Sequence, residues 1–132
     1  MSARERLHAA VLAHLGENAS LDPLRVFDAP QERAAVPFAV IEEPVLGDWS
    51  ACGWTGREGR LVIAVFDEGE QPRRLRFLMG RLEDAMARLP DDLGEGWRIL
   101  QSRLIRSRGV RAGGRRWGGA IEFQVRMFRM DS

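Results

Sequence analysis

The chain has 132 residues, of which 45% are hydrophobic and 30% charged, and its formal net charge is +1. These values are typical of one soluble domain spanning residues 1–132. They exclude a membrane-spanning protein, because no run approaches the roughly 18 apolar residues that a span needs. The N-terminal residues lack the apolar stretch of a signal peptide, so export is not expected. A single cysteine, Cys52, excludes an internal disulfide and any cysteine-based metal cage.

Charge is distributed unevenly along the chain. All 20 basic residues are arginine, and nine of them lie in residues 97–132 beside only two acidic residues. That segment therefore carries a net charge of +7, and residues 1–96 carry −6. We expect a charge-polarised molecule whose basic part meets either nucleic acid or an acidic surface on a neighbouring copy.

The first part of the chain predicts one helix and two short strands. Apolar residues recur every four positions over residues 3–15, which predicts a helix. A strand is expected over residues 24–27. A second strand is expected over residues 38–43, held between Pro37 and Pro44.

The middle of the chain predicts a loop, a buried strand and a second helix. Residues 46–59 show no periodicity and contain two tryptophans and four glycines, which favours a loop. Apolar residues occupy both odd and even positions over residues 60–66, which predicts a strand covered on both faces, one by a helix and the other within the fold or by a neighbouring copy. Helical spacing of apolar residues follows from Pro72 to Leu89, and Pro90 ends it.

The last part predicts a long hairpin. Strands are expected over residues 97–106 and 117–130, joined by a long basic loop over residues 107–116. In the first of these strands the apolar residues change between odd and even positions twice, at Ile99 and Leu100 and at Leu104 and Ile105, which predicts a bulge or burial on both sides. The predicted class is α+β, in the order α-β-β-β-α-β-β, with a mainly antiparallel sheet and two helices packed on one face.

Residues with catalytic potential do not form a pattern that supports chemistry. His8 and His14 are six residues apart, which places them on different sides of a helix and argues against a shared metal. Cys52 has no histidine nearby in sequence. The adjacent carboxylates, Glu42 with Glu43 and Asp91 with Asp92, are interpreted as solvated charges. We therefore predict no catalytic residue, no metal ligand and no cofactor.

Two glycine-containing segments rich in tryptophan or arginine are the candidate docking surfaces. These side chains are the ones most enriched in interface hot spots. The alternative interpretation is that the tryptophans cap the core and that the arginines form a solvated hairpin tip. The candidate interface residues are Asp48, Trp49, Trp54, Arg57, Arg108, Arg111, Arg115, Arg116 and Trp117.

The order of several short motifs resembles the tail-completion or tail-terminator proteins of long-tailed phages and gene transfer agents. The resemblance covers nearly the whole chain. It rests on an N-terminal helix, the second helix and these segments: Arg25-Val26-Phe27-Asp28, Val36-Pro37-Phe38-Ala39-Val40-Ile41, Asp48-Trp49-Ser50, the strand from Gly59 to Phe66, and the stretch from Arg115 to Arg126. Phe38 stands where the family often has a tyrosine, and residues 57–60 lack a histidine that is often found there.

The resemblance implies a structural virion protein and no enzyme. Such proteins form a ring, usually six-fold, that caps the head-proximal end of the tail tube, stops its elongation and joins the tail to the head connector. The implied partners are identical copies, the tail-tube protein and the connector or stopper protein, with DNA passing through the lumen without specific binding and no membrane involved. Gln124 and Arg126, on the polar face of the last strand, are the candidate lumen-facing residues. The implied location is the tail of a virion or phage-like particle, after synthesis in a bacterial cytoplasm.

Two other function classes remain open at this point. The basic hairpin from Arg108 to Arg116 could follow the phosphates of a nucleic acid. Such binding would weaken steeply with salt, whereas assembly through apolar surface would not. A small hydrolase that uses Cys52 as its nucleophile is the third class, and it requires the fold to bring His8 or His14 to the cysteine.

Overall fold

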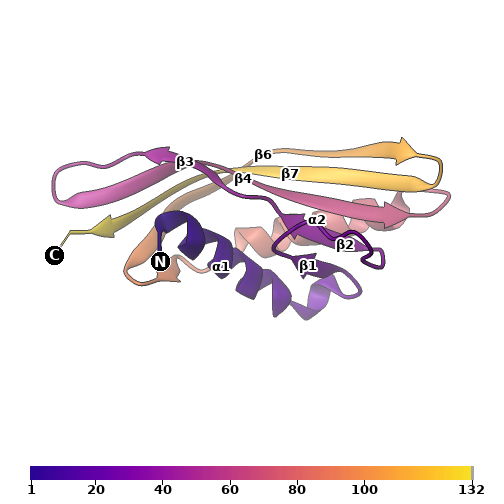
Figure 1. Cartoon of the computed structure of the whole chain (residues 1–132), viewed down its shortest axis with the longest axis horizontal. Helices are drawn as coiled ribbons and strands as arrows, with labels where there is room; N and C mark the ends of the chain where they lie inside the picture. The colour runs from indigo at the N-terminus through magenta and orange to yellow at the C-terminus, as the bar shows by residue number, and fades with distance from the viewer. Residues whose placement is uncertain (132) are drawn as a thin grey trace.

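The computed structural model describes residues 1–131 as two helices beside one curled, mostly antiparallel sheet of seven strands. Figure 1 shows α1 and α2 below the longest strands of the sheet, and these strands extend past the helices at both ends. The elements follow one another in the order α1, η1, β1, β2, β3, β4, α2, β5, β6 and β7. The predicted α+β class with a mainly antiparallel sheet is therefore confirmed.

The N-terminal helix and the first two strands match the predicted segments. Helix α1 spans Ala3–Gly16, and it begins with a capping box in which Ser2 and Glu5 bond each other's backbone N–H groups. A 3-10 turn, η1, follows at Ala19–Leu21. The short strands are β1, Arg25–Phe27, and β2, Phe38–Ile41.

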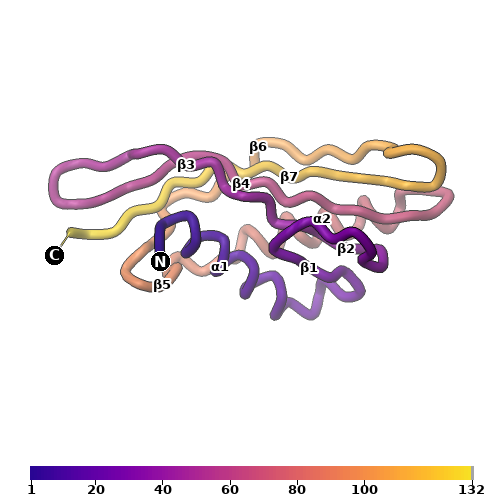
Figure 2. Tube along the Cα trace, in the orientation of Figure 1, coloured from indigo at the N-terminus to yellow at the C-terminus, as the bar shows by residue number. Residues whose placement is uncertain are grey.

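The remaining elements include three strands that are much longer than the others. Their bounds are β3 Val45–Asp48, β4 Trp54–Glu68, α2 Arg73–Ala87, β5 Asp92–Gly94, β6 Trp97–Gly113 and β7 Arg116–Met130. Strand β5 lies beside the start of α1 (Figure 2). Strands β4, β6 and β7 have 15, 17 and 15 residues. At about 3.3 Å per residue each is about 50 Å long.

The sheet order is β1-β2-β4-β7-β6-β5, and β3 pairs with β4 beside β2. Strand β1 is parallel to β2, and every other pair is antiparallel. Strand β7 pairs with β4 along its whole length, from Arg116 opposite Glu68 to Met130 opposite Trp54. The three long strands therefore form a continuous ribbon on which the other elements are arranged.

Alternation along the long strands separates a buried face from an outer face. In β4 and β7 the odd-numbered residues from Leu61 to Val65 and from Ile121 to Met127 are buried. They share one hydrophobic core with buried side chains of both helices, among them Leu7 and Leu82. We call the face that carries the even-numbered residues of β4 and β7 the outer face.

The prediction of a loop over residues 46–59 is wrong. Strand β3 pairs with the first part of β4, from Val45 opposite Arg60 to Asp48 opposite Arg57, so most of this segment is a β-hairpin. The glycines that suggested a loop allow a close approach, since a Cβ at Gly59 would overlap the carbonyl oxygen of Val45. Pairing with β7 supplies the strand structure that local propensity does not predict.

The prediction of a long basic loop over residues 107–116 is also wrong. Strand β6 continues to Gly113 and β7 begins at Arg116, so the connection consists of Gly114 and Arg115. Both Gly113 and Gly114 have positive φ, at 119° and 55°, which glycine adopts without steric cost. The basic segment is therefore a two-stranded ribbon instead of a free loop.

Two further expectations concern the strand faces. The predicted bulges are confirmed, because the β6–β7 register shifts between Ile99 and Gln101 and between Leu104 and Arg106. Within residues 1–131 only one face of residues 60–66 is fully covered, and cover of the second face by a neighbouring copy stays a prediction. Val62 and Ala64 are only half-buried, and Phe66 on the same face is 38% exposed. The predicted order of elements also misses β3 and β5.

Two glycine substitutions test the pairing of β3 with β4. Gly59→Ala should destabilise the fold by about 1–3 kcal/mol because the new methyl group overlaps the backbone of β3. Gly80→Ala, in α2 with no atom within 4 Å of its Cβ position, should stabilise it by about 0.5–1 kcal/mol. Urea unfolding of both variants measures the difference, and equal unfolding midpoints would contradict the observed register.

Candidate docking surfaces

The predicted interface residues lie at two opposite ends of the ribbon. Asp48, Trp49, Trp54 and Arg57 belong to the β3–β4 hairpin, at the end where the chain terminates (Figure 1). The β6–β7 hairpin at the other end holds the remaining five, Arg108, Arg111, Arg115, Arg116 and Trp117. The fold therefore makes two separate surfaces instead of one site.

The first surface is an apolar cluster, which we call the tryptophan patch, formed by Trp49, Trp54, Leu100, Phe128 and Met130. These five side chains line a cavity of about 250 Å³. The two tryptophan rings meet edge to face at 5.1 Å between centroids, and Trp54 meets Phe128 at 6.3 Å. Leu100 and Met130 are 61% and 64% exposed. An exposed apolar cluster of this kind is typical of a protein contact site.

Three residues of the tryptophan patch were not among the predicted interface residues. Leu100 is the residue at the first β6 bulge, which falls outside the regular register. Phe128 and Met130 are even-numbered residues of β7, whose buried apolar residues are odd-numbered. Two sequence signals could have identified them. One is the pair of adjacent apolar residues Ile99 and Leu100, which breaks the alternation of β6, and the other is the presence of apolar residues on the otherwise polar face of β7.

Asp48 and Arg57 pair with each other within the hairpin. The guanidinium of Arg57 lies 3.1 Å from a carboxylate oxygen of Asp48, which also accepts a hydrogen bond from Ser50 at 2.6 Å. Asp48 is exposed and Arg57 is half-buried, so this ion pair contributes little to stability. It links β3 to β4 in the hairpin that carries Trp49 and Trp54.

The second surface is the basic end of the β6–β7 ribbon. The indole N–H of Trp117 donates to the carbonyl of Gly69 at 2.9 Å, and the side chain packs against the core, so Trp117 anchors the base of the hairpin, and its part in an interface stays a prediction. Arg111 lies over the Trp117 ring at 5.9 Å. Arg108, Arg115 and Arg116 form no ion pair with any residue in the part of the chain that the structure describes.

A polar belt crosses the outer face between these two ends. Glu122 lies 3.4 Å from Arg60 and 3.0 Å from Arg106, which joins β4, β7 and β6. Gln124 accepts a hydrogen bond from Arg103 at 2.6 Å. Arg126 lies over the Trp49 ring at 4.9 Å, so the predicted lumen-facing arginine also borders the tryptophan patch.

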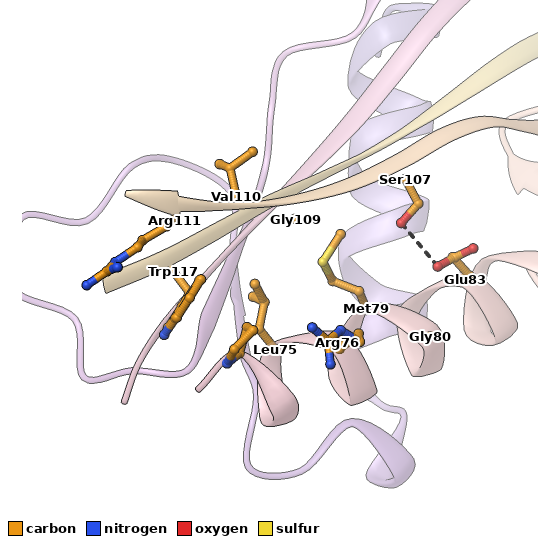
Figure 3. A pocket seen from close by; sticks show the side chains of 11 residues that line it. Leu75, Arg76, Met79, Gly80, Glu83, Ser107, Gly109, Val110, Arg111 and Trp117 are labelled. Atoms are coloured by element: carbon orange, nitrogen blue, oxygen red, sulfur yellow. Dashed lines mark hydrogen bonds between the residues drawn. The ribbon is translucent and has the colours of Figure 1, made fainter. Parts of the chain in front are cut away.

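A groove of about 360 Å³ lies between α2 and β6, on the side of the sheet that faces the helices (Figure 3). Leu75 and Met79 of α2 form its apolar wall, and Gly109 of β6 leaves it open because it has no side chain. Arg76 and Arg111 also line it. Glu83 accepts a hydrogen bond from Ser107 at 3.2 Å.

Comparison with known protein families identifies the family to which the chain belongs. The family described as "Tail completion protein gp17" matches residues 5–127, which is nearly the whole chain. The chain belongs to this family. The resemblance inferred from the sequence is therefore confirmed. A tail completion protein is a structural protein of a virion tail, so the tail of a virion or phage-like particle is its location.

A solved structure supports the same fold. A chain in the structure described as "Virion of native gene transfer agent (GTA) particle" is 22% identical, with a TM-score of 0.80. The alignment covers 97% of this chain and 99% of that chain, so the whole fold is shared. A comparison with curated proteins finds no significant match.

The geometry of this tail completion protein does not assemble the residues considered for chemistry. The ring nitrogen Nε2 of His8 lies 3.2 Å from the carbonyl oxygen of Ile41, and that of His14 lies 2.7 Å from the carbonyl oxygen of Ala85. Both histidines are half-buried, so they tie α1 to its neighbours instead of lying free on the helix surface. Cys52 is exposed at the tip of the β3–β4 hairpin. The fold therefore does not bring His8 or His14 to Cys52, which a cysteine nucleophile would require.

Residues 1–131 contain no group of three or more histidine, cysteine, aspartate or glutamate side chains placed to hold a metal ion. No helix among them is long and apolar enough to cross a membrane.

One buried ion pair fixes the start of α2 to the end of β4. Asp67 is 4% exposed, and Oδ2 accepts a hydrogen bond from Nε of Arg74 at 3.0 Å. Burial alone would raise the pKa of the Asp67 carboxyl, but hydrogen bonds from Arg74 and from the backbone N–H of Glu68 outweigh it and hold the pKa below its ordinary value. This pair holds α2 against the end of the ribbon that carries the basic surface.

The lowered pKa of Asp67 predicts acid sensitivity. The folded carboxylate binds its proton less readily than the unfolded one, so its contribution is complete above about pH 4 and is lost as the pH falls further. Asp67→Asn should flatten this part of the stability profile, and Arg74→Leu should cost about 1–3 kcal/mol by leaving a buried acceptor without its partner. Urea unfolding between about pH 2.5 and pH 7 measures both. The exposed Asp84→Asn is the control, and an unchanged acid slope in Asp67→Asn would contradict the assignment.

Proposed function

We propose that this protein forms a closed ring that caps the head-proximal end of a tail tube, stops its elongation and joins the tail to the head connector. The proposal takes the whole chain as one domain of the tail-terminator type. It rests on family membership over residues 5–127 and on two chemically different surfaces at opposite ends of one ribbon. A subunit in a ring must contact a neighbour on each side and the tube below, which requires several separate surfaces.

The two ends of the ribbon suit different contacts. The tryptophan patch offers rigid aromatic side chains for a contact that excludes water. The basic end offers arginines without acidic partners, which suit a negatively charged surface on another protein. We assign the docking contacts with the tube and with the connector to these two ends.

The polar belt on the outer face is our candidate for the lumen of the ring. The odd-numbered residues of β7 are buried in the core that side chains of both helices share, so Gln124, Arg126 and Glu122 on the outer face remain available to line a water-filled channel. Glu122 beside Arg60 and Arg106, and Glu58 beside Arg126, offset part of the positive charge of the belt and engage three of its arginines in ion pairs. Arginines that are engaged in ion pairs bind phosphates less readily than free ones, which suits a channel that lets DNA pass without holding it. No chemical step is part of this function.

Assembly of the purified protein tests the proposal. Negative-stain electron microscopy and mass photometry should show closed rings, either with the protein alone or after addition of the tail-tube protein of the same particle. Rings of about six copies are expected. A protein that stays monomeric at high concentration and does not bind the tube protein would contradict the proposal.

Charge reversal tests the role of the basic end. The triple variant Arg111→Glu, Arg115→Glu and Arg116→Glu should keep its fold, because all three side chains are exposed, and should abolish the joining of tails to heads. A matched control, Arg4→Glu with Arg73→Glu and Arg88→Glu, makes the same change in net charge on the helices. Counting joined particles by electron microscopy measures the effect, and normal joining in the triple variant would remove the basic end from the proposal.

A further inference from the structure

We infer that copies of this protein associate head to tail through the two opposite edges of the sheet, with a basic edge of one copy meeting an acidic edge of the next. The inference rests on the proposed ring and deepens it by assigning the two halves of its subunit contact. Three observations carry it, namely an unpaired strand edge, opposite charge on the two edges, and the sheet order that separates them.

The first observation is the free edge of β6. Strand β5 pairs only with the start of β6, at Trp97 and Arg98, and the backbone of Ile99 still bonds to Asp91. Within residues 1–131, no other strand pairs with β6 between Leu100 and Gly113 on the side away from β7. An unpaired edge of this length is a template for contact with another chain.

The second observation is the charge of this edge. Three exposed arginines of β6 pair with even-numbered residues of β7 and so lie on the outer face along this edge, and we call them the basic edge: Arg103, Arg106 and Arg108. Within residues 1–131, Arg106 alone among them has an ion pair, with Glu122 at 3.0 Å. The groove of Figure 3 lies on the other face of the same strand, where Arg76 and Arg111 add further positive charge.

The third observation is the opposite edge of the sheet. Strands β1, β2 and β3 lie on the side of β4 away from β7, so the segments next to them occupy this edge. Five exposed acidic residues lie there, and we call them the acidic edge: Asp22, Asp28, Glu32, Glu42 and Glu43. None of the five forms an ion pair within residues 1–131. Two arginines in the same segments, Arg25 and Arg33, leave the edge with a net negative charge.

These observations favour a second copy as the occupant of the basic edge. The chain itself carries the complementary surface, and the sheet holds the two surfaces on opposite sides, so one copy cannot satisfy both within itself. A contact between two different edges is heterologous, and repeating it generates a ring when the rotation between copies closes. Arginines on an exposed edge also prevent indiscriminate pairing, because only an acidic partner compensates them.

Complementary charge reversals test the pairing. One variant carries Arg103→Glu and Arg108→Glu on the basic edge, and another carries Glu42→Arg and Glu43→Arg on the acidic edge. Mass photometry and analytical ultracentrifugation, with and without the tail-tube protein, measure assembly. Each variant alone should associate about 100-fold more weakly than wild type, because like charges then face each other across the contact. An equimolar mixture should assemble again, since alternating copies restore opposite charges at every contact.

Matched controls keep the result specific. Arg4→Glu with Arg88→Glu, and Glu17→Arg with Asp84→Arg, make the same changes in net charge at exposed positions within or directly after the helices and should assemble as wild type does. Circular dichroism shows that each variant is folded.

Each outcome separates this inference from the proposed function. Wild-type rings together with normal assembly of both variants would overturn the edge pairing and leave the ring standing. Variants that fail alone and also fail when mixed would overturn the head-to-tail pairing. A wild-type protein that never assembles would overturn the proposed function as well. Loss of salt-sensitive DNA binding in the basic-edge variant, with assembly unchanged, would assign the basic edge to nucleic acid instead.

Discussion

Pairing of β7 with β4 along fifteen consecutive residues is the constraint on which the rest of the structure depends. A side chain in a strand points to the face opposite that of its neighbour, so this register decides which residues reach the core over the whole length of the ribbon. It places Ile121 and Phe123 against the helices, and it places Glu122 and Gln124 on the outer face. A shift of one residue would exchange these sets and bury the charges of the polar belt.

The same ribbon explains why the protein has surfaces to offer at its ends. The helices have 14 and 15 residues and rise about 1.5 Å per residue, so each is less than half the length of a long strand. The ends of the sheet therefore extend past the helical layer (Figure 1). At one end the exposed side chains are the aromatic and aliphatic residues of the tryptophan patch, and at the other they are arginines. Rigid, chemically different ends suit a family whose members complete a tail.

Sequence reasoning worked where a local pattern coincided with the tertiary contact. The amphipathic spacing of α1 and α2 and the parity switches of β6 predicted the helices and both bulges. It failed where long-range pairing creates structure. Residues 46–59 and 107–113 are rich in glycine and arginine and have weak strand propensity, but β7 is long enough to pair with them or with their partner strands. The candidate site was predicted in part for the same reason. Trp49 and Trp54 were identified, whereas Leu100 and Phe128 join them only through the bulge and the register of β7.

We propose that this chain is a ring-forming component at the head-proximal end of a tail, with the outer face of β7 toward the lumen. Cryo-electron microscopy of an intact particle that contains the protein is the decisive measurement. We expect a closed ring of this fold between tube and connector, with Gln124 and Arg126 facing the channel and the β6 edge of each copy against the acidic edge of the next. Density for the chain elsewhere in the particle, or a ring whose channel is lined by the helices, would rule out this arrangement.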